Sequence, residues 1–127
     1  MIVAGVGFRG AAGADEIVAL VERALALAGS APEALARLAT VQALADAPAF
    51  RNAARRLAVP GVGVDDAALR ATEPALRTRS ARSLEAHGVG SVAEAAALGA
   101  AGPGAVLVLA RIASPAATCA LARGNLP

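Results

Sequence analysis

Several residue types are missing or scarce in this chain of 127 residues. Lysine does not occur, which excludes chemistry that needs a lysine Schiff base. Trp and Tyr are absent and there are only two Phe, too few to build the stacking platform used by single-strand nucleic-acid binders. One Cys and one His exclude an internal disulfide, a multi-cysteine metal site and a classical histidine metal site.

Charge and long apolar runs are limited as well. The net charge of +2 is small for a protein that binds duplex DNA, but it suits a small anionic ligand. The N-terminus lacks the basic and apolar regions of a signal peptide. The apolar stretch 95–110 is interrupted by Gly102, Pro103 and Gly104, so it is too broken for a membrane span. We therefore expect a cytoplasmic protein with no nucleic-acid or membrane partner.

The residues that are present predict one α/β domain over residues 1–127 with an aliphatic core. Strands are expected at 2–6, 38–41, 105–110 and 118–121, and residues 59–64 are expected to contain a Pro-Gly turn and a short strand. Helices are expected at 14–28, 48–57, 74–86 and 92–98. Alternation of strands and helices predicts a three-layer α/β/α fold around a mainly parallel mixed sheet. The last two strands are separated by only about seven residues, which favours an antiparallel C-terminal pair.

Three short patterns predict helix starts. Ser30 with Glu33, and Ser91 with Glu94, have the spacing of a capping box, in which the serine caps the helix and the glutamate binds back to the serine amide. Asp46 precedes Pro48 and is expected to cap the following helix.

The glycines from Gly5 to Gly10 have the spacing G-x-G-x-x-G after a strand. A dinucleotide site also needs a helix that begins at the glycines and an acidic residue about 20 positions further on. Here the helix begins near Gly13 and the second strand ends near Gln42, so we expect no tight binding of NAD, NADP or FAD. Two interpretations stay open: an anion cradle to which Arg9 contributes, and a tight turn with a solvated Arg9.

Four further features each allow a structural interpretation beside a functional one. The loop 88–91 is either a simple helix start or a site for a ligand carboxylate. His87 is either a general acid–base group or the last residue before a helix-ending glycine. Cys119 is expected to be inert core. A cluster of arginines forms a solvated face or borders an acidic ligand: Arg70, Arg77, Arg79 and Arg82.

Several stretches resemble one known family, the CobE / CbiG C-terminal domain family of cobalamin (vitamin B12) biosynthesis. They are IVAGVGFRG at 2–10, ADEI at 14–17, LAT at 38–40 with Asp46 and Pro48, GVGSVAEAAAL at 88–98, PGAVLVLAR at 103–111, and Thr118 with Ala120. The resemblance covers nearly the whole chain, and a domain of this size is similar to the free-standing CobE form.

This resemblance implies a protein of the corrin pathway. Its precorrin or corrinoid intermediates are macrocycles fringed with acetate and propionate groups. Two-domain relatives resemble hydrolases that open the δ-lactone of cobalt-precorrin-5A and release acetaldehyde. Many relatives carry Lys and Glu near the positions that Leu44 and Ala47 occupy in this chain. If those polar residues act chemically in the relatives, this chain lacks them, and their absence favours binding of an intermediate over hydrolysis. A non-catalytic structural partner of a pathway enzyme is the third possibility.

A ligand of a parallel α/β sheet binds beyond the carboxyl ends of its strands. We therefore expect an anionic corrinoid to contact residues that follow strands or begin helices, with Arg9 and Arg111 as the best candidates for carboxylate contacts. The complete set is Gly7, Arg9, Gly10, Thr40, Gly90, Ser91 and Arg111. No catalytic residue, metal or cofactor is predicted.

Overall fold

The computed structural model describes residues 1–124, and five strands form one sheet in the order β3-β2-β1-β5-β4. The strands are β1 (Ile2–Phe8), β2 (Leu35–Val41), β3 (Gly61–Val64), β4 (Val106–Ala113) and β5 (Ala117–Arg123). β1 is parallel to β2, and β2 is parallel to β3, whereas β5 is antiparallel to both β1 and β4. β4 therefore runs in the direction of β1, and β5 alone of these strands is reversed. The mainly parallel mixed sheet and its antiparallel C-terminal pair are confirmed.

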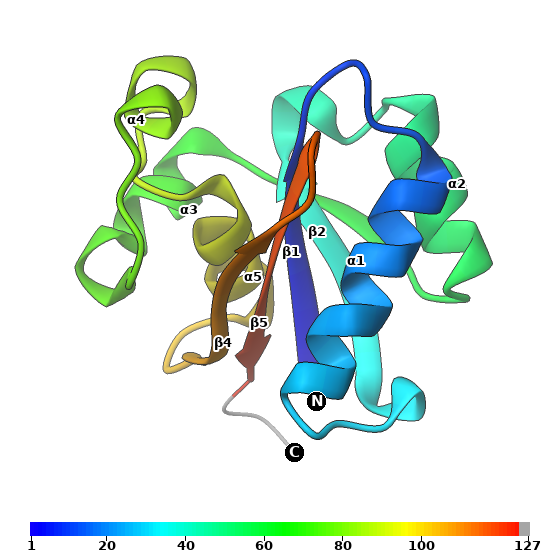
Figure 1. Cartoon of the computed structure of the whole chain (residues 1–127). Coiled ribbons are helices and arrows are strands. Elements are labelled where there is room, and N and C mark those ends of the chain that lie inside the picture. Colours follow the sequence, from blue (N-terminus) through cyan, green and yellow to red (C-terminus); the bar gives the residue numbers. More distant parts are fainter. Residues whose placement is uncertain (125–127) are drawn as a thin grey trace.

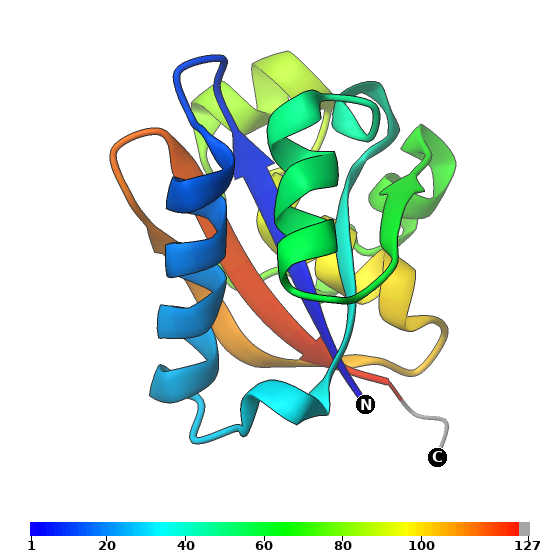
Figure 2. The same cartoon turned by 90° about the vertical axis from the view of Figure 1, so that its right-hand side faces the viewer.

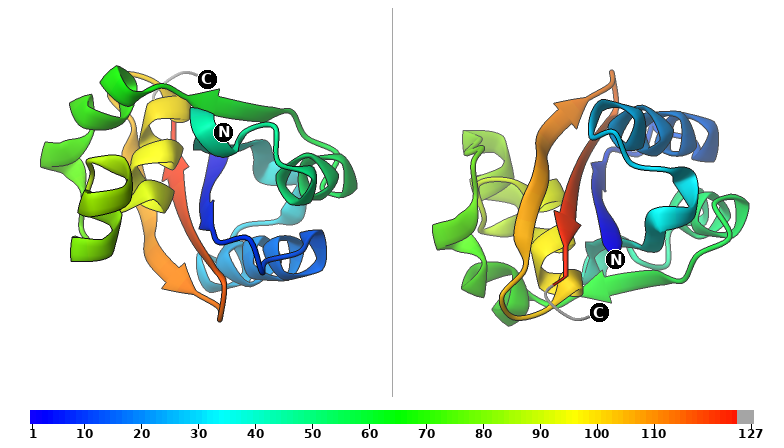
Figure 3. Two further views of the ribbon diagram at one scale, coloured as in Figure 1. Left: turned by 90° about the horizontal axis from the view of Figure 1, so that it is seen from above. Right: turned by 90° about the horizontal axis from the view of Figure 1, so that it is seen from below.

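Helices cover both faces of this sheet (Figures 1 and 3). α1 (Ala14–Leu27) and α2 (Pro48–Arg56) lie side by side on one face, as Figure 2 shows. α3 (Asp66–Ala71), α4 (Ala81–His87) and α5 (Val92–Ala101) lie on the other. The short 3₁₀ helices are η1 (Pro32–Ala34), η2 (Gln42–Leu44) and η3 (Glu73–Ala75). No helix within residues 1–124 is long and apolar enough to cross a membrane.

The alternation of side chains along β1 divides the core into two aliphatic layers. Val6 packs with Ile17 and Phe50 on the α1 and α2 face. Val3 belongs to the hydrophobic layer on the opposite face, which also contains Leu69 and most of α5. Phe8 and Phe50 stack with ring centroids 6.4 Å apart.

The alanine-rich helix α5 lies very close to β1. A Cβ placed on Gly5 would be 2.1 Å from the carbonyl oxygen of Ala93 and 2.4 Å from the amide nitrogen of Ala97. Only a glycine allows this approach, so the first glycine of the G-x-G-x-x-G pattern serves helix packing. α5 is buried around almost its whole circumference, because small side chains let the helix sink between the sheet and α3.

The segment expected as one helix over 74–86 is divided, and this prediction is wrong in part. η3 ends at Ala75, irregular chain follows, and α4 begins at Ala81. The backbone amides of Arg77 and Thr78 donate to the side chain of Glu94 instead of to preceding carbonyls. A contact between residues far apart in the sequence therefore overrides local helix propensity.

The predicted caps are correct at one of three places. Ser91 caps α5 and accepts a hydrogen bond from the Glu94 amide, but the Glu94 carboxylate does not return to it. Ser30 and Asp46 cap nothing. The N-cap residues of η1 and α2 lie one position after the predicted ones, at Ala31 and Ala47, which have no side-chain acceptor, and each helix then begins at a proline. The proline at the first helical position needs no hydrogen bond there.

Candidate functional site

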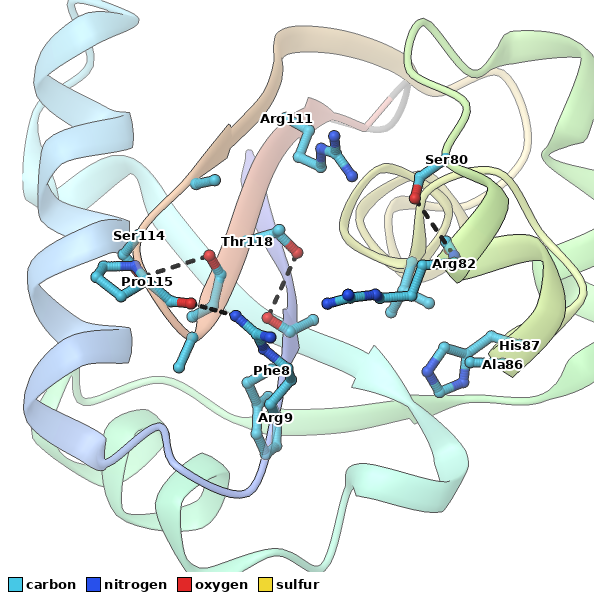
Figure 4. A pocket seen from close by; sticks show the side chains of 16 residues that line it. Phe8, Arg9, Ser80, Arg82, Ala86, His87, Arg111, Ser114, Pro115 and Thr118 are labelled. Atoms are coloured by element: carbon cyan, nitrogen blue, oxygen red, sulfur yellow. Dashed lines mark hydrogen bonds between the residues drawn. The ribbon is translucent and has the colours of Figure 1, made fainter.

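A cavity of about 440 Å³ opens at the edge of the sheet where β1 and β4 end (Figure 4). Since these strands run in the same direction, the loop after β1 and the β4–β5 hairpin meet at this edge, while the N-terminus lies at the opposite edge (Figure 1). α4 forms the facing wall. The lining residues are Gly7, Phe8, Arg9, Ser80, Arg82, Ser83, Ala86, His87, Val92, Arg111, Ala113, Ser114, Pro115, Ala116, Ala117 and Thr118.

The lining is basic and carries no carboxylate side chain. Three guanidinium groups contribute, from Arg9, Arg82 and Arg111, together with the imidazole of His87. In Figure 4 the Arg82 side chain extends from α4 toward Thr118. The ion pairs within residues 1–124 join other arginines to acids, namely Arg56 to Asp15 and Arg79 to Glu73. None of the three cavity arginines forms an ion pair with an acid of the described part of the chain, although the charge of Arg9 does interact with the Glu16 carboxylate. An anionic ligand could therefore pair with these arginines.

The hairpin wall is fixed by α1 and by the loop after β1. The Glu16 carboxylate accepts hydrogen bonds from the Ser114 hydroxyl and from the Ala116 amide. The Arg9 guanidinium donates to the carbonyl of Pro115, and the Arg9 amide donates to that of Ala116 at 2.9 Å. The hydrogen bond from Ser114 and then that from Ala116 lower the pKa of Glu16, and nearby Arg9 acts in the same direction.

The α4 wall is held mainly at its ends. No residue of α4 is fully buried, although the hydroxyl oxygen of Ser83 is. The Ser80 hydroxyl accepts from the Ser83 amide as the N-cap, and the Ser80 amide donates to the carbonyl of Gly90 at 2.7 Å. Gly88 ends the helix with a φ of 74°, a left-handed conformation that favours glycine. The interpretation of His87 as the residue before a helix-ending glycine is therefore confirmed, although its ring also faces the cavity.

Glu94 connects the two walls from behind. Its side chain is fully buried, and it accepts hydrogen bonds from the amides of Arg77, Thr78 and Arg111 and from the Thr78 hydroxyl. Burial alone would raise the pKa of Glu94, but the four hydrogen bonds outweigh it and leave the pKa below its ordinary value. The group is thus an ionised anchor that the cavity surface does not expose.

The structure brings some predicted site residues together and separates others. Gly7, Arg9 and Arg111 line the cavity. Gly10 lies at the exposed tip of the loop after β1 and outside the lining. Thr40 is fully buried and donates to the Val6 carbonyl at 2.8 Å.

Gly90 and Ser91 are also buried, behind the cavity wall. A Cβ on Gly90 would be 3.0 Å from the Cα of Arg79, so this glycine allows close packing of the loop. The amide that a ligand carboxylate was expected to use at Gly90 points toward Glu73, at 3.4 Å from its carboxylate.

Several lining residues were not among the predicted ligand contacts. Thr118 could have been found from strand pairing, because it is the register partner of Gly7 on β5. Ser80, Ser83 and Arg82 could not be placed, since α4 is positioned by contacts that are distant in sequence. Arg82 did stand in the arginine cluster, and of that cluster only Arg82 reaches the cavity.

Metal and thiol chemistry find no support among the described residues. No group of three or more His, Cys, Asp or Glu side chains within residues 1–124 could hold a metal ion. Cys119 is fully buried in β5, and burial raises the pKa of its thiol to about 12. A thiol of this kind stays protonated, as expected for inert core.

Comparison with known proteins agrees with the fold and the motifs. The family model described as the C-terminus of cobalamin synthesis G matches residues 2–122. The chain belongs to this family. It is 43% identical over 121 residues to Protein CobE of a Sinorhizobium species, which covers 95% of this chain and 79% of the relative.

Two solved structures of proteins from cobalamin biosynthesis are also similar. CobE, described as a protein from the cobalamin (vitamin B12) biosynthetic pathway, superposes with a TM-score of 0.91 at 38% identity, over 97% of this chain and 89% of that one. The cobalamin biosynthesis protein ChiG of Agrobacterium tumefaciens gives a TM-score of 0.77 at 34% identity, over 99% and 100% of the two chains. The expected resemblance is confirmed, and this chain is a member of a family of cobalamin biosynthesis proteins.

Proposed function

We propose that this CobE-like protein binds a polycarboxylated precorrin or corrinoid intermediate, with the carboxylates of the ligand in the basic cavity. The observation that carries the proposal is the convergence of Arg9, Arg82 and Arg111 on one cavity whose lining holds no carboxylate. Guanidinium forks match carboxylates in shape and charge. A flat, many-armed acid can engage several of them at once.

The ligand class follows from combining this lining with the family. Intermediates of a corrin pathway carry acetate and propionate arms around an apolar ring. The cavity offers apolar surface from Val92, Ala113 and Ala117 between its charged groups. Such a lining suits one edge of a macrocycle, with the rest of the ring outside the cavity.

Binding is favoured over hydrolysis by the surroundings of His87. A general base is normally oriented by a second polar group, most often a carboxylate. Among residues 1–124, the cavity lining that includes His87 holds no carboxylate side chain that could orient the imidazole. A structural role beside another pathway enzyme remains the outcome if no corrinoid binds.

A matched pair of ligands tests the proposal. Dicyano-cobyrinic acid and dicyano-cobinamide share the corrin ring, but the first carries free carboxylates and the second carries amides. We expect a saturable change in the visible spectrum with the acid, weakened by added salt, and little change with the amide. Arg82→Ala and Arg111→Ala should each weaken binding about tenfold, whereas Arg51→Ala on the exposed face of α2 should not.

Three results would contradict the proposal. Equal affinity for the acid and the amide would remove the role of the carboxylates. Release of acetaldehyde from a precorrin-5A lactone, at many turnovers per protein, would establish hydrolysis instead. Absence of corrinoid binding together with a stable complex on a sizing column would favour a structural partner.

A further inference from the structure

Glu94 differs from every other acidic residue in the described part of the chain. It is the only charged side chain among residues 1–124 that is buried, and no surface of it reaches the solvent. A buried carboxylate is costly unless hydrogen bonds compensate the lost hydration. The hydrogen-bond donors around Glu94 therefore indicate what this buried carboxylate does in the fold.

The partners belong to two separate elements. Oε1 accepts from the amide of Arg77 at 2.7 Å and from that of Thr78 at 2.9 Å. Oε2 accepts from the Thr78 hydroxyl at 2.7 Å and from the Arg111 amide at 2.9 Å. One oxygen thus holds mainly the loop before α4, and the other reaches β4. The carboxylate of α5 ties these segments to each other.

These two segments carry opposite walls of the cavity. Thr78 lies two positions before Ser80, the residue that caps α4, and α4 presents Arg82 and His87. Arg111 presents its own guanidinium from β4. Because no residue of α4 is fully buried, hydrogen bonds at its ends contribute much to its position. These are the bond from the Ser80 amide to the Gly90 carbonyl and the bonds of the preceding loop with Glu94. Glu94 is therefore one of the connections that set the distance between the α4 wall and β4, beside the hydrogen bond from the Arg77 guanidinium to the Leu107 carbonyl of β4.

We propose that Glu94 is a positioning residue that sets the separation of the arginines on α4 and β4, and so the fit of the cavity to a polycarboxylated ligand. The inference rests on the proposed function. Glu94 touches no ligand itself. Its side chain is buried, so it affects binding indirectly, by holding the backbone at Thr78 and Arg111.

Glu94→Gln is the sharpest change, because it preserves shape and removes the charge. A glutamine has one acceptor oxygen and one NH₂ donor. In either orientation the NH₂ group faces at least one backbone amide, and two donors cannot bond. Therefore either β4 or the loop that precedes α4 loses its hydrogen bond to residue 94. Thr78→Val is milder, since it removes the hydroxyl donor and retains both backbone amides.

A matched control lies on the same side of the sheet. Thr72→Val also removes a threonine hydroxyl that donates a hydrogen bond, here to the backbone carbonyl of Leu69 at 2.6 Å, three residues earlier in the chain. Thr72 lies outside the lining of the basic cavity. The variant therefore reproduces the lost hydroxyl without disturbing the connection between the walls.

The experiment measures the dissociation constant for dicyano-cobyrinic acid, the melting temperature, and the backbone amide NMR spectrum of each variant. We expect Glu94→Gln to weaken binding about tenfold or more and Thr78→Val about threefold, with Thr72→Val unchanged. Amide signals of Arg82 and His87 should shift in the first two variants, although neither residue contacts Glu94. A role limited to local stability would leave those signals in place.

The outcomes separate the two proposals. If the unmodified protein binds no cobyrinic acid, the proposed function fails and this inference fails with it. If the unmodified protein binds the acid, and folded Glu94→Gln binds it equally well, only the positioning role is overturned. If Glu94→Gln does not fold, Thr78→Val decides, because an affinity equal to that of Thr72→Val then overturns the role.

Discussion

The carboxylate of Glu16 accepts a hydrogen bond of 2.8 Å from the backbone amide of Ala116, although the two residues are 100 positions apart in the chain. It also accepts one from the Ser114 hydroxyl. The first turn of α1 thereby holds the tip of the β4–β5 hairpin, which forms one wall of the basic cavity. The N-terminal and C-terminal parts of the chain complete this site together.

Glu16→Ala should loosen the hairpin without unfolding the protein. The Ala116 amide loses its acceptor, and we expect its hydrogen exchange to become several-fold faster, with little change in the exchange of the core strands. Hydrogen exchange followed by NMR gives this comparison. Glu22→Ala, an exposed position on the same helix, is the control and should leave Ala116 unaffected. Equal protection of Ala116 in both variants would show that Glu16 does not hold the hairpin.

Arg9→Ala should reduce ligand affinity more than stability. Losing one charge-assisted hydrogen bond to a carboxylate removes about 1.5–3 kcal/mol, on the order of tenfold or more in affinity. The Arg9 side chain also donates to the Pro115 carbonyl at an exposed position, so we expect only a small fall in melting temperature. Corrinoid titration and thermal unfolding of this variant, beside Arg51→Ala, provide the measurements. If Arg9→Ala binds as tightly as the parent, the glycine loop is only a turn.

The sequence was most informative where the position of a residue follows directly from strand order. Arg9 follows β1 and Arg111 lies in β4, and the rule that ligands meet the carboxyl ends of strands was enough to expect both at one edge. Arg82 depends instead on α4, whose position rests on contacts distant in sequence, among them those of Glu94. The same glutamate has the local spacing of a capping box, and this pattern hid its long-range partners. No local pattern distinguishes a glutamate that returns to its own helix from one that binds another loop.

Gly5→Ala should be strongly destabilising, which also tests why the G-x-G-x-x-G pattern is present. The new Cβ would lie 2.1 Å from a backbone oxygen of α5, so the helix must move away from the sheet. Such overpacking costs typically about 1–3 kcal/mol and sometimes more. Gly10→Ala is the control, because nothing lies within 4 Å of a Cβ there. Urea unfolding that shows equal stability for the two variants would contradict the close approach of α5 and β1.

Ser91→Ala should lower stability through the loss of a helix cap. The Ser91 hydroxyl accepts from the Glu94 amide at 3.3 Å, and removal of an N-cap acceptor costs about 1 kcal/mol. This corresponds to a fall of roughly 4 °C in the melting temperature of a domain of this size. Since Ser91 is buried and lies outside the cavity lining, the fall should occur with or without ligand. An unchanged melting temperature would mean that the cap contributes nothing.

The buried carboxylate of Glu94 should make stability depend on pH in the acid range. In the folded protein its pKa lies below the ordinary value of 4.5, because four hydrogen bonds to the ionised form outweigh the effect of burial. The unfolded chain therefore takes up the proton first as the pH falls. The stabilisation from Glu94 is complete above about pH 4.5 and is lost progressively as the pH falls through the folded pKa.

Glu94→Gln removes this titration. At about pH 7 the variant should be less stable than the parent by roughly 2–3 kcal/mol, the value of hydrogen bonds to a charged acceptor. The difference should shrink as the pH is lowered below about 4.5, because the parent then loses what the variant already lacks. Glu16, whose pKa is lowered as well, contributes acid sensitivity to both proteins and cancels in the comparison. Urea unfolding at a series of pH values measures the difference, and a gap that stays constant down to about pH 3 would show that Glu94 is not an ionised anchor.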